Sequence, residues 1–556
     1  MKLNRFIFLF SIIGAFLLGS CNKAPTIPSE DKIAPTETSL EYTDYGASNE
    51  LKFELNSSKW YRNDLELGLP DPCIVYEDGT YYIFGTTDRT GAKSFDCYST
   101  TDFSSYKYYK DIYAPTDTTW GNGSLFAPEI VKIDNLYYMY YNASHYEDGV
   151  DTEKSGIMIA VSENITGPYR DYVGKDANGN PLDNSKGPII RDINASNYGI
   201  LDVTTLFDGD DMYLYWSIYE TNIMQYIVGV KMIDPVTPDW STYQVLIRPG
   251  AINANDRFDT TLSWEAYKGF RVAEGPQVTK IKDGRYMISY SVNHYLDKYY
   301  TVCYAIGDNP LGPFEKPYVK GENWSNILFG YAGLQNGTVF DQWAGFTGGC
   351  GHHYIFKVGD QYMIAYHAFK NRNDISSGRC VAIDYLFFDE EGNPYVHGPS
   401  YSAMPLPEAT SGYKNIALNA KVIAEGTETP DRLNDNYIVE HYNLAQEANK
   451  EADFKGGQYC YIQIQFDKEY TIGGLAIFNS AYYEKVLYSI DFINFGNSNA
   501  ILNSSYNRQY VEDAKEFAFP CGNFAYDFDD IKTNKITIGI NSAYDFSLNE
   551  IIVLGK

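Results

Sequence analysis

The stretch EDGTYYIFGT at residues 77–86 has four close relatives further along the chain. They read IDNLYYMYYN at 133–142, GDDMYLYWSI at 209–218, KDGRYMISYS at 282–291 and VGDQYMIAYH at 358–367. Each copy joins a turn sequence such as Asp-Gly to an alternating run that is rich in Tyr. Asp-Gly and similar pairs tolerate the positive φ that a hairpin turn requires, so each copy predicts an antiparallel hairpin.

Five similar hairpins predict five similar β-sheets. Aligned on the first Tyr of each run, the copies are 56, 76, 73 and 76 residues apart, at Tyr81, Tyr137, Tyr213, Tyr286 and Tyr362. Repeats of this kind, with no helical periodicity between them, are typical of a β-propeller, in which each blade packs against its neighbours. The intervals exceed those of compact propeller repeats, so we expect long loops on one face. A β-sandwich built from five hairpins is the alternative.

A polar residue precedes each hairpin. Counting back 10, 8, 11, 12 and 10 residues from the five Tyr residues leads to Asp71, Glu129, Asp202, Glu274 and His352. The innermost strand of each propeller blade lines the central channel, so we expect these five side chains to meet near the axis. Crowded carboxylates repel one another and raise at least one pKa, a cost that a purely structural core avoids. The cluster therefore indicates acid–base chemistry or a bound cation.

Three of these carboxylates suit the hydrolysis of a glycosidic bond. That reaction needs a carboxylic acid that protonates the leaving oxygen and a carboxylate that activates water or attacks carbon. Asp71, between two prolines, is well placed as the ionised base, and the longer Glu274 suits the acid. Asp202 is expected to keep the proton on Glu274, since a neighbouring anion disfavours a second ionisation. Each residue alone could equally be a turn or helix-capping acid, but three at matching offsets favour a catalytic set.

These motifs, in this order, resemble glycoside hydrolase family 43; they are Asp71-Pro72, Phe126-Ala127-Pro128-Glu129, Leu201-Asp202, Glu274-Gly275-Pro276, Gly351-His352 and Tyr366-His367. The resemblance spans about residues 60–405. It implies a five-bladed propeller that cleaves arabinose- or xylose-containing plant polysaccharides with inversion. It also implies that Asp71 is the general base, Asp202 the pKa modulator and Glu274 the general acid.

The same resemblance implies further site residues. Phe126, His352 and Arg379 are expected to contact the sugar, with Phe126 standing where the family usually has Trp. Arg379 corresponds to an arginine that binds sugar hydroxyls, although unaided it would be interpreted as a surface residue. His352 lies where many members have a central calcium ion or an ordered water, so a structural Ca²⁺ is a hypothesis, and no cofactor is expected to be required. Glu129 is interpreted as structural or substrate-facing.

The N-terminus predicts export. Residues 1–20 combine Lys2 and Arg5 with an apolar run that is too short for a comfortable membrane span, as in a secretory signal peptide. The run ends in Leu-Gly-Ser-Cys, which resembles a bacterial lipobox with Cys21 as the lipidated residue. Residues 21–58, rich in Pro, Thr, Ser, Glu and Asp, predict a flexible tether. We expect a secreted lipoprotein, anchored to a membrane outside the cytoplasm and facing the periplasm or the cell exterior.

The repeats stop near residue 405, and 413–556 predicts a β-sandwich of the jelly-roll type. Its evidence is a set of short alternating runs at 461–466, 472–478, 535–540 and 549–554. The opening Lys-Asn-Ile-Ala-Leu-Asn and closing Asn-Glu-Ile-Ile-Val resemble the discoidin-like, coagulation-factor type C domain, often a carbohydrate-binding appendage of secreted glycosidases. Packing beside the propeller is the alternative role. Spacing also raises a Cys460–Cys521 disulfide as a hypothesis.

Net charge and composition bear on the class of binding partner. The 556 residues include 44 Lys+Arg and 72 Asp+Glu, which gives a formal net charge of −28 and repels phosphate backbones, so no nucleic-acid partner is expected. The 52 Tyr suit both sheet packing and sugar binding.

We therefore predict an all-β protein, with a five-bladed propeller at 59–405 followed by a β-sandwich at 413–556. Its predicted activity is that of an inverting glycoside hydrolase that acts on arabinose- or xylose-containing polysaccharide or oligosaccharide and releases terminal α-L-arabinofuranose. A β-xylosidase, an exo-galactanase and a non-catalytic glycan-binding lipoprotein are the alternatives.

Overall fold

The computed structural model describes residues 36–38, 58–61, 63, 67–89, 92–147, 150–192, 199–220, 224–269, 271–321, 325–330, 333–335, 338–340, 348–371, 374–400, 403–438, 451–479, 488–496 and 524–556. The predicted signal peptide, the predicted lipidation site Cys21, and Cys521 of the hypothesised disulfide lie outside these residues. Within the predicted tether, Thr36–Thr38 forms strand β1. In these ranges, no helix is both long and apolar enough to cross a membrane.

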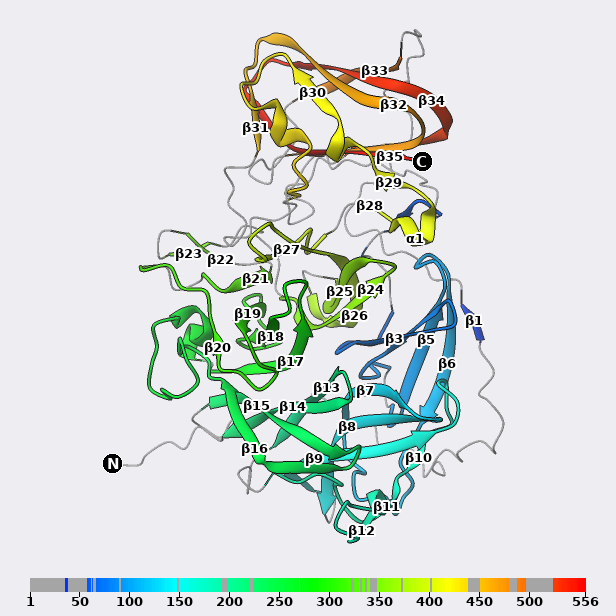
Figure 1. Cartoon of the computed structure of the whole chain (residues 1–556), viewed down its shortest axis with the longest axis vertical. Helices are drawn as coiled ribbons and strands as arrows, with labels where there is room; N and C mark the ends of the chain where they lie inside the picture. Colours follow the sequence, from blue (N-terminus) through cyan, green and yellow to red (C-terminus); the bar gives the residue numbers. More distant parts are fainter. Residues whose placement is uncertain are drawn as a thin grey trace.

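Five antiparallel sheets follow one another along the chain, and we call them blades I to V (Figure 1). Blade I comprises β3 (Cys73–Glu77), β4 (Thr80–Phe84), β5 (Phe95–Thr100) and β6 (Tyr106–Tyr113), with β1 at its edge. Blade II comprises β7 (Leu125–Ile133), β8 (Leu136–Glu147), β9 (Val150–Ser162) and β10 (Arg170–Asp171). Blade III comprises β13 (Ile200–Asp208), β14 (Asp211–Glu220), β15 (Met224–Asp234) and β16 (Thr237–Ile247).

The last two blades have the same order. Blade IV comprises β17 (Ala273–Lys280), β18 (Tyr286–Val292), β19 (Thr301–Gly307) and β20 (Phe314–Glu315), and β21 (Ile327–Gly330) also pairs with β19. Blade V comprises β24 (Gly351–Val358), β25 (Gln361–Asn371), β26 (Asp374–Phe388) and β27 (Pro394–Val396). Short elements in the connections are β11 (Val173–Lys175), β12 (Pro181–Asp183), η1 (Asn184–Lys186), η3 (Ser263–Gly269), β22 (Gly333–Gln335) and β23 (Thr338–Phe340).

The first strands of the blades form a closed ring. Strands β3, β7, β13, β17 and β24 contact one another in this order, and β24 in turn contacts β3. Figure 1 shows the five sheets arranged around a common centre. The predicted five-bladed β-propeller is therefore confirmed, and the sandwich of five hairpins is excluded.

Each of the five repeats folds as the hairpin that its sequence predicts. In blade I the turn residues Asp78 and Gly79 have φ values of 48° and 82°, as a two-residue turn between β3 and β4 requires. In blade IV the turn is longer, because β17 ends at Lys280 and β18 begins at Tyr286. These hairpins lie at one end of the blades, so the loops between second and third strands and between successive blades lie at the other end.

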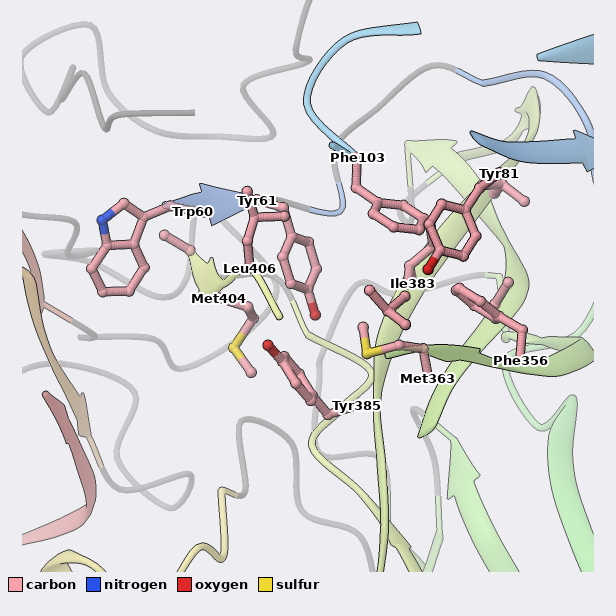
Figure 2. Close-up of a cluster of buried hydrophobic side chains, with 14 of the residues drawn as sticks. Trp60, Tyr61, Tyr81, Phe103, Phe356, Met363, Ile383, Tyr385, Met404 and Leu406 are labelled. Atoms are coloured by element: carbon pink, nitrogen blue, oxygen red, sulfur yellow. The ribbon is translucent and has the colours of Figure 1, made fainter. Parts of the chain in front are cut away.

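The ring is closed by the segment that precedes blade I (Figure 2). Strand β2 (Trp60–Tyr61) pairs with β28 (Met404–Pro405), which follows blade V. Nearby, the Asn63 side chain donates to the Ile383 carbonyl at 2.7 Å and accepts from the Ile383 amide at 2.8 Å. Figure 2 shows the buried aromatic and aliphatic side chains that pack where these segments meet, and they form one core with residues of blades I and V.

A further sheet, separate from the five blades, follows the short helix α1 (Glu408–Ser411). Its strands are β29 (Lys414–Asn415), β30 (Lys421–Ala424), β31 (Ala452–Phe454), β32 (Gln458–Asn479), β33 (Ser489–Phe495), β34 (Phe524–Ser542) and β35 (Phe546–Gly555), with turns η4 (Ala417–Asn419) and η5 (Pro430–Leu433). This seven-stranded sheet encloses a core of its own. The separate runs predicted at 461–466 and 472–478 are one strand, β32, whose register shifts let its first part pair with β30 and its second part with β35. The β-sandwich and discoidin-like assignments stay predictions.

Candidate active site

The first strand of each blade begins beside a residue with a positive φ. The φ values are 58° at Asp71, 42° at Ala127, 59° at Asp202, 53° at Gly275 and 42° at His352. In blades II to V, the pairing of first and second strands shifts register at the same place. Such a bulge changes the direction in which the neighbouring side chains point. Each blade therefore has one residue with a positive φ at the start of its first strand, and these five residues lie at the same end of the ring.

In two blades, the residue with the positive φ is not the polar residue that the repeat predicted at that position. In blade IV, Glu274 lies one residue before the equivalent Gly275, and in blade II, Glu129 lies two residues after the equivalent Ala127. The offsets counted from Tyr could not locate them, because the turns differ in length and the bulges shift the register.

Asp71 is buried among cationic and imidazole groups. Its Oδ1 accepts a hydrogen bond from Arg379 Nη1 at 3.0 Å and faces Nδ1 of His352 at 3.3 Å and Nδ1 of His367 at 3.6 Å. Burial alone would raise the pKa of Asp71, but the charges of Arg379 and His352 and the contact with His367 hold it well below its usual range. Asp71 is therefore ionised at neutral pH, the state that a general base requires.

Glu274 is held in the opposite state. Burial and the neighbouring charge of Asp202 raise the pKa of Glu274 to about 7, although a hydrogen bond from Tyr300 opposes this. Burial raises the pKa of Asp202 as well, and its Oδ2 accepts a hydrogen bond from the Gly275 amide at 2.9 Å. The structure thus combines a carboxylate of low pKa, Asp71, with a carboxylic acid of raised pKa, which is the arrangement of an acid–base pair.

His352 lies between the carboxylates. Its Nδ1 is 3.3 Å from Asp71 Oδ1 and 3.8 Å from Asp202 Oδ2, and its amide donates to Ser291 Oγ at 2.7 Å. Burial lowers the pKa of His352, but the carboxylates of Asp202, Asp71 and Glu274 outweigh burial and raise it. A protonated His352 offsets part of the negative charge that the three acids gather in one place.

Glu129 does not join this cluster. It is buried, and its Oε1 accepts from the Thr205 hydroxyl at 2.9 Å and the Thr205 amide at 3.3 Å, which ties blade II to blade III. Burial raises its pKa to about 7. The expectation that four carboxylates meet at the axis is therefore wrong: three acids and His352 meet, and Glu129 takes the structural role that was one of its two interpretations.

The two remaining predicted residues stand at the same end of the channel. Phe126 is partly exposed and directly precedes Ala127, the position of blade II that is equivalent to Asp71. Arg379, on β26, keeps 18% of its side chain exposed while its Nη1 contacts Asp71, and its backbone amide donates to Asp88 Oδ2 at 2.6 Å. Arg379 is thus a largely buried partner of Asp71, and its interpretation as a surface arginine is wrong.

Sequence reasoning missed the partners of the acid. Tyr300 OH donates to Glu274 Oε1 at 2.8 Å, and Gln225 Nε2 donates to Glu274 Oε2 at 3.1 Å. The Tyr300 ring also stacks on His367, with ring centroids 5.2 Å apart, and His367 faces Asp71. His367 had a signal, because it ends the fifth repeat. Gln225 and Tyr300 had none, since both lie where loops enter strands outside the repeated stretch.

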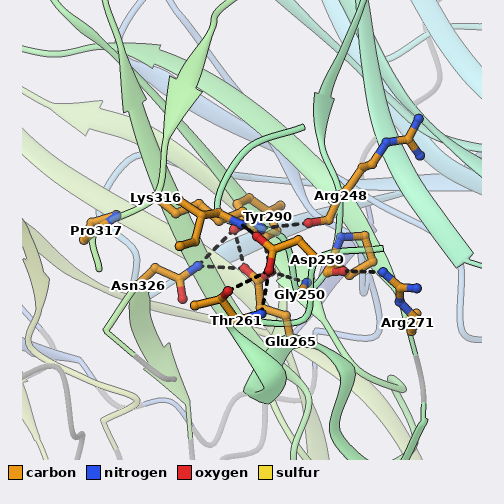
Figure 3. Close-up of polar contacts among 12 residues, drawn as sticks. Arg248, Gly250, Asp259, Thr261, Glu265, Arg271, Tyr290, Lys316, Pro317 and Asn326 are labelled. Atoms are coloured by element: carbon orange, nitrogen blue, oxygen red, sulfur yellow. Dashed lines mark hydrogen bonds and ion pairs between the residues drawn. The ribbon is translucent and has the colours of Figure 1, made fainter. Parts of the chain in front are cut away.

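A buried ion pair fixes the connection that leads to β17 and Glu274 (Figure 3). Lys316 Nζ contacts Glu265 Oε2 at 2.5 Å, and their side chains are 2% and 0% exposed. Glu265 also accepts hydrogen bonds from Tyr290 OH, the Asn326 side chain and the Gly250 amide. The long loop between β16 and β17 is therefore anchored in blade IV, as Figure 3 shows.

The described residues provide no set of protein ligands for a metal ion. In the part of the chain that the structure describes, no three or more His, Cys, Asp or Glu side chains are grouped so that they could hold a metal ion. His352 Nδ1 instead faces two carboxylates. The residues present do not fit a directly bound ion, so no step below is routed through one.

Known proteins resemble this chain in sequence and in structure. An extracellular endo-α-(1→5)-L-arabinanase 2 of Bacillus subtilis (strain 168) is 24% identical over 436 residues, 67% of this chain and 81% of that protein. The β-D-galactofuranosidase xynD of Aspergillus niger is 24% identical over 336 residues, 58% of this chain and 80% of that protein. The crystal structure of a thermostable family-43 glycoside hydrolase matches with a TM-score of 0.47 and 22% identity, over 61% of this chain and 96% of its own.

The family model named Glycosyl hydrolases family 43 matches residues 64–394, more than half of the chain and all five blades. The match includes the first strand of every blade and the three clustered acids. The chain therefore belongs to glycoside hydrolase family 43.

Proposed function

We propose that the protein is an inverting glycosidase that releases terminal α-L-arabinofuranose from arabinose-containing plant polysaccharide. The observation that carries the proposal is the pair of carboxyl groups with opposed pKa values, Asp71 low and Glu274 about 7, inside one buried cluster. A purely glycan-binding propeller gains nothing from crowding three acids, so this pair favours turnover over binding alone.

The mechanism follows from the two protonation states. Glu274 donates its proton to the glycosidic oxygen while the bond from that oxygen to the anomeric carbon breaks. Asp71 accepts a proton from the water that attacks the same carbon from the opposite face, so the configuration inverts. Asp202 keeps Glu274 protonated in the free enzyme, and the hydrogen bonds from Tyr300 and Gln225 fix the orientation of the acid.

The relatives support arabinose as the sugar. The B. subtilis protein is named as an endo-α-(1→5)-L-arabinanase, a name that specifies arabinose, and the A. niger protein as a β-D-galactofuranosidase, a name that specifies a furanose. A neutral furanose also suits a chain whose formal charge is −28.

Three measurements test the proposal. The wild type is expected to hydrolyse aryl α-L-arabinofuranoside faster than aryl β-xyloside, and to release only arabinose from linear α-1,5-arabinan. Glu274→Gln is expected to lower kcat/KM on arabinan by at least about 10²-fold, in line with the loss of a general acid. Unchanged activity in Glu274→Gln would overturn the mechanism, and oligosaccharide products would replace terminal release by internal cleavage.

Export and anchoring belong to the same proposal. We infer that Cys21 carries the lipid and that the following segment holds the enzyme at a membrane outside the cytoplasm. The support is the order of basic, apolar and small residues before Cys21. Labelling of expressing cells with a fatty-acid analogue is expected to modify the wild type and not Cys21→Ser. A calcium ion held near His352 through water, with no direct protein ligand set, stays a prediction; treatment with EDTA should then lower activity or the melting temperature.

A further inference from the structure

The C-terminal sheet carries three neighbouring aromatic rings on one face, two of them exposed and the third half-buried. Tyr459 and Tyr461, on β32, are 36% and 41% exposed, and their ring centroids are 5.0 Å apart. Phe492, on β33, lies with its ring centroid 6.1 Å from that of Tyr461. We call these three residues the aromatic strip. The residues that alternate with them on β32, Cys460 and Ile462, are buried in the domain core, so the strip lies on the outer face of the sheet.

A glycine keeps the strip flat. Strand β34 runs between β32 and β33, and its Gly539 pairs with both Tyr461 and Phe492. A Cβ atom at Gly539 would meet the Phe492 ring at 2.3 Å, so the ring lies across the glycine. The Tyr461 and Phe492 rings can therefore approach each other over β34 with no side chain between them.

Uncharged polar groups continue the same face. Alternate residues of the two strands place Gln463, Thr537 and Asn541 beside the rings, and Gln463 pairs directly with Thr537. The Tyr459 hydroxyl donates to Asp491 Oδ2 at 2.9 Å, which fixes the orientation of its ring. Aromatic faces pack on the CH groups of a sugar, while amides and hydroxyls bond its hydroxyls. This combination suits a neutral glycan better than an apolar protein surface or an anion.

Strand stability explains only part of the strip. An aromatic ring that covers a strand glycine is a known stabilising device, and it accounts for Phe492. Tyr is also favoured in strands. Neither reason requires Tyr459 and Tyr461 to leave more than a third of their surface exposed.

The strip faces away from the propeller. It lies on the first part of β32, whereas the second part carries Gly474, which contacts Trp60 of the propeller-closing segment. Figure 1 shows β33 and the adjoining part of β34 on the side of the domain remote from the blades. The propeller therefore does not cover the strip, which leaves its rings open to a polymer chain.

We propose that the aromatic strip binds an extended, uncharged polysaccharide and keeps the propeller on the polymer that it cleaves. The naming of arabinan as that polymer rests on the proposed function, whereas the chemistry of the strip requires only a neutral glycan.

Affinity electrophoresis of the full chain in gels that contain arabinan, xylan or galactan tests this proposal. The wild type is expected to be retarded by at least one of them, and Tyr459→Ala/Tyr461→Ala to bind at least about tenfold more weakly. The matched control is Tyr544→Ala, a 67% exposed Tyr of the same domain outside the strip, which should bind as the wild type does. All variants should keep the wild-type kcat/KM on the aryl arabinofuranoside.

Equal retardation of the double variant and Tyr544→Ala would overturn the proposal, as would free migration of the wild type in all three gels. If the double variant has a lower melting temperature than the wild type, Tyr461→Trp replaces it in the test. Its larger ring should preserve or strengthen binding, and weaker binding would contradict the proposal. Absence of aryl-arabinofuranoside hydrolysis would count against the proposed function and leave the binding result to stand by itself.

Discussion

Asp71 and Glu274 show how neighbours divide two similar groups between two chemical states. Asp71 is buried and Glu274 is half-buried, and burial alone would raise the pKa of each. Asp71 has Arg379 at 3.0 Å and stays ionised at neutral pH, whereas Glu274 has the anion Asp202 nearby and keeps its proton up to about pH 7. The division of labour between base and acid is thus set by the contacts of each carboxyl group.

The alkaline limb of the pH profile reports on Glu274. Because its pKa is about 7, kcat/KM is expected to fall as the pH rises past about 7. Tyr300→Phe removes a hydrogen bond that favours the ionised form, so the limb should move to higher pH. Asp202→Asn removes the anion that disfavours ionisation, so the limb should move to lower pH.

Profiles of kcat/KM between pH 4 and 10 on an aryl arabinofuranoside measure both shifts. Tyr295→Phe, on a loop near Arg379, serves as the control that should leave the limb in place. Shifts of the same sign in Tyr300→Phe and Asp202→Asn would show that Glu274 does not set this limb.

The sequence allowed part of the site to be predicted. Asp71, Asp202, Glu274 and His352 precede repeated hairpins, so the repeat itself indicated that they converge. Gln225 could not be predicted in this way, because its contact with Glu274 joins the third strand of one blade to the first strand of the next. Such contacts depend on how neighbouring blades are rotated, which the alternation of one strand does not encode.

At the scale of elements, the loop between β16 and β17 depends on a buried charge pair. Lys316→Met leaves Glu265 as an unpaired buried anion and is expected to lower the free energy of unfolding by about 3–5 kcal/mol. Lys316→Met/Glu265→Leu removes both charges and should recover much of that loss. Urea denaturation measures both values, and equal losses in the single and double variants would contradict this account.

Glu129 links blades II and III at a cost that depends on pH. Its folded-state pKa, about 7, lies above the ordinary value of 4.5, so the protonated form is favoured in the folded state. Its contribution to stability is thus fully present below about pH 4.5 and is lost as the pH rises towards 7. Glu129→Gln cannot ionise, so its free energy of unfolding should not show this loss. The difference in free energy of unfolding between variant and wild type should therefore shift in favour of the variant by up to about 3 kcal/mol between pH 4.5 and pH 8.

Denaturation of both proteins at pH 4.5 and pH 8 checks the expectation for Glu129. The difference between them should grow with pH, and a constant difference would show that Glu129 stays ionised in the folded protein.

Elements with a local signal were the ones that could be predicted. The hairpins could be predicted because each turn contains an Asp or Gly residue with a positive φ, such as Asp78, Gly79 and Gly284, and the preference for that conformation is a local property of the residue. The continuity of β32 was missed, since its register shifts interrupt the alternation between its two predicted runs. Bulges beside Phe126, Leu201 and Glu274 were missed for the same reason.

At the scale of the whole molecule, Trp60 joins the propeller to the C-terminal sheet. It is 2% exposed, lies on the strand that closes the ring, and packs against Gly474. Trp60→Ala is expected to cost about 3–5 kcal/mol and to separate the unfolding of the two units in calorimetry. Phe258→Ala, at an 81% exposed position, should change stability by less than about 0.5 kcal/mol. A single unchanged transition in Trp60→Ala would argue against this coupling.

The arrangement of the two units could not be predicted from the chain. The hairpin repeats and the alternating runs after residue 405 predicted two β units, but the contacts of Trp60, Asn63 and Leu406 join segments more than 300 residues apart. No periodic pattern marks such pairs, and only packing in three dimensions selects them.

Inversion requires that Asp71 activates water on the face of the sugar opposite to Glu274. Proton NMR of the sugar first released from an aryl α-L-arabinofuranoside, recorded before mutarotation, distinguishes inversion from retention. We expect β-arabinofuranose to appear first, because a single displacement inverts the anomeric carbon. Initial release of α-arabinofuranose would contradict it, since retention requires a covalent intermediate and a different role for Asp71.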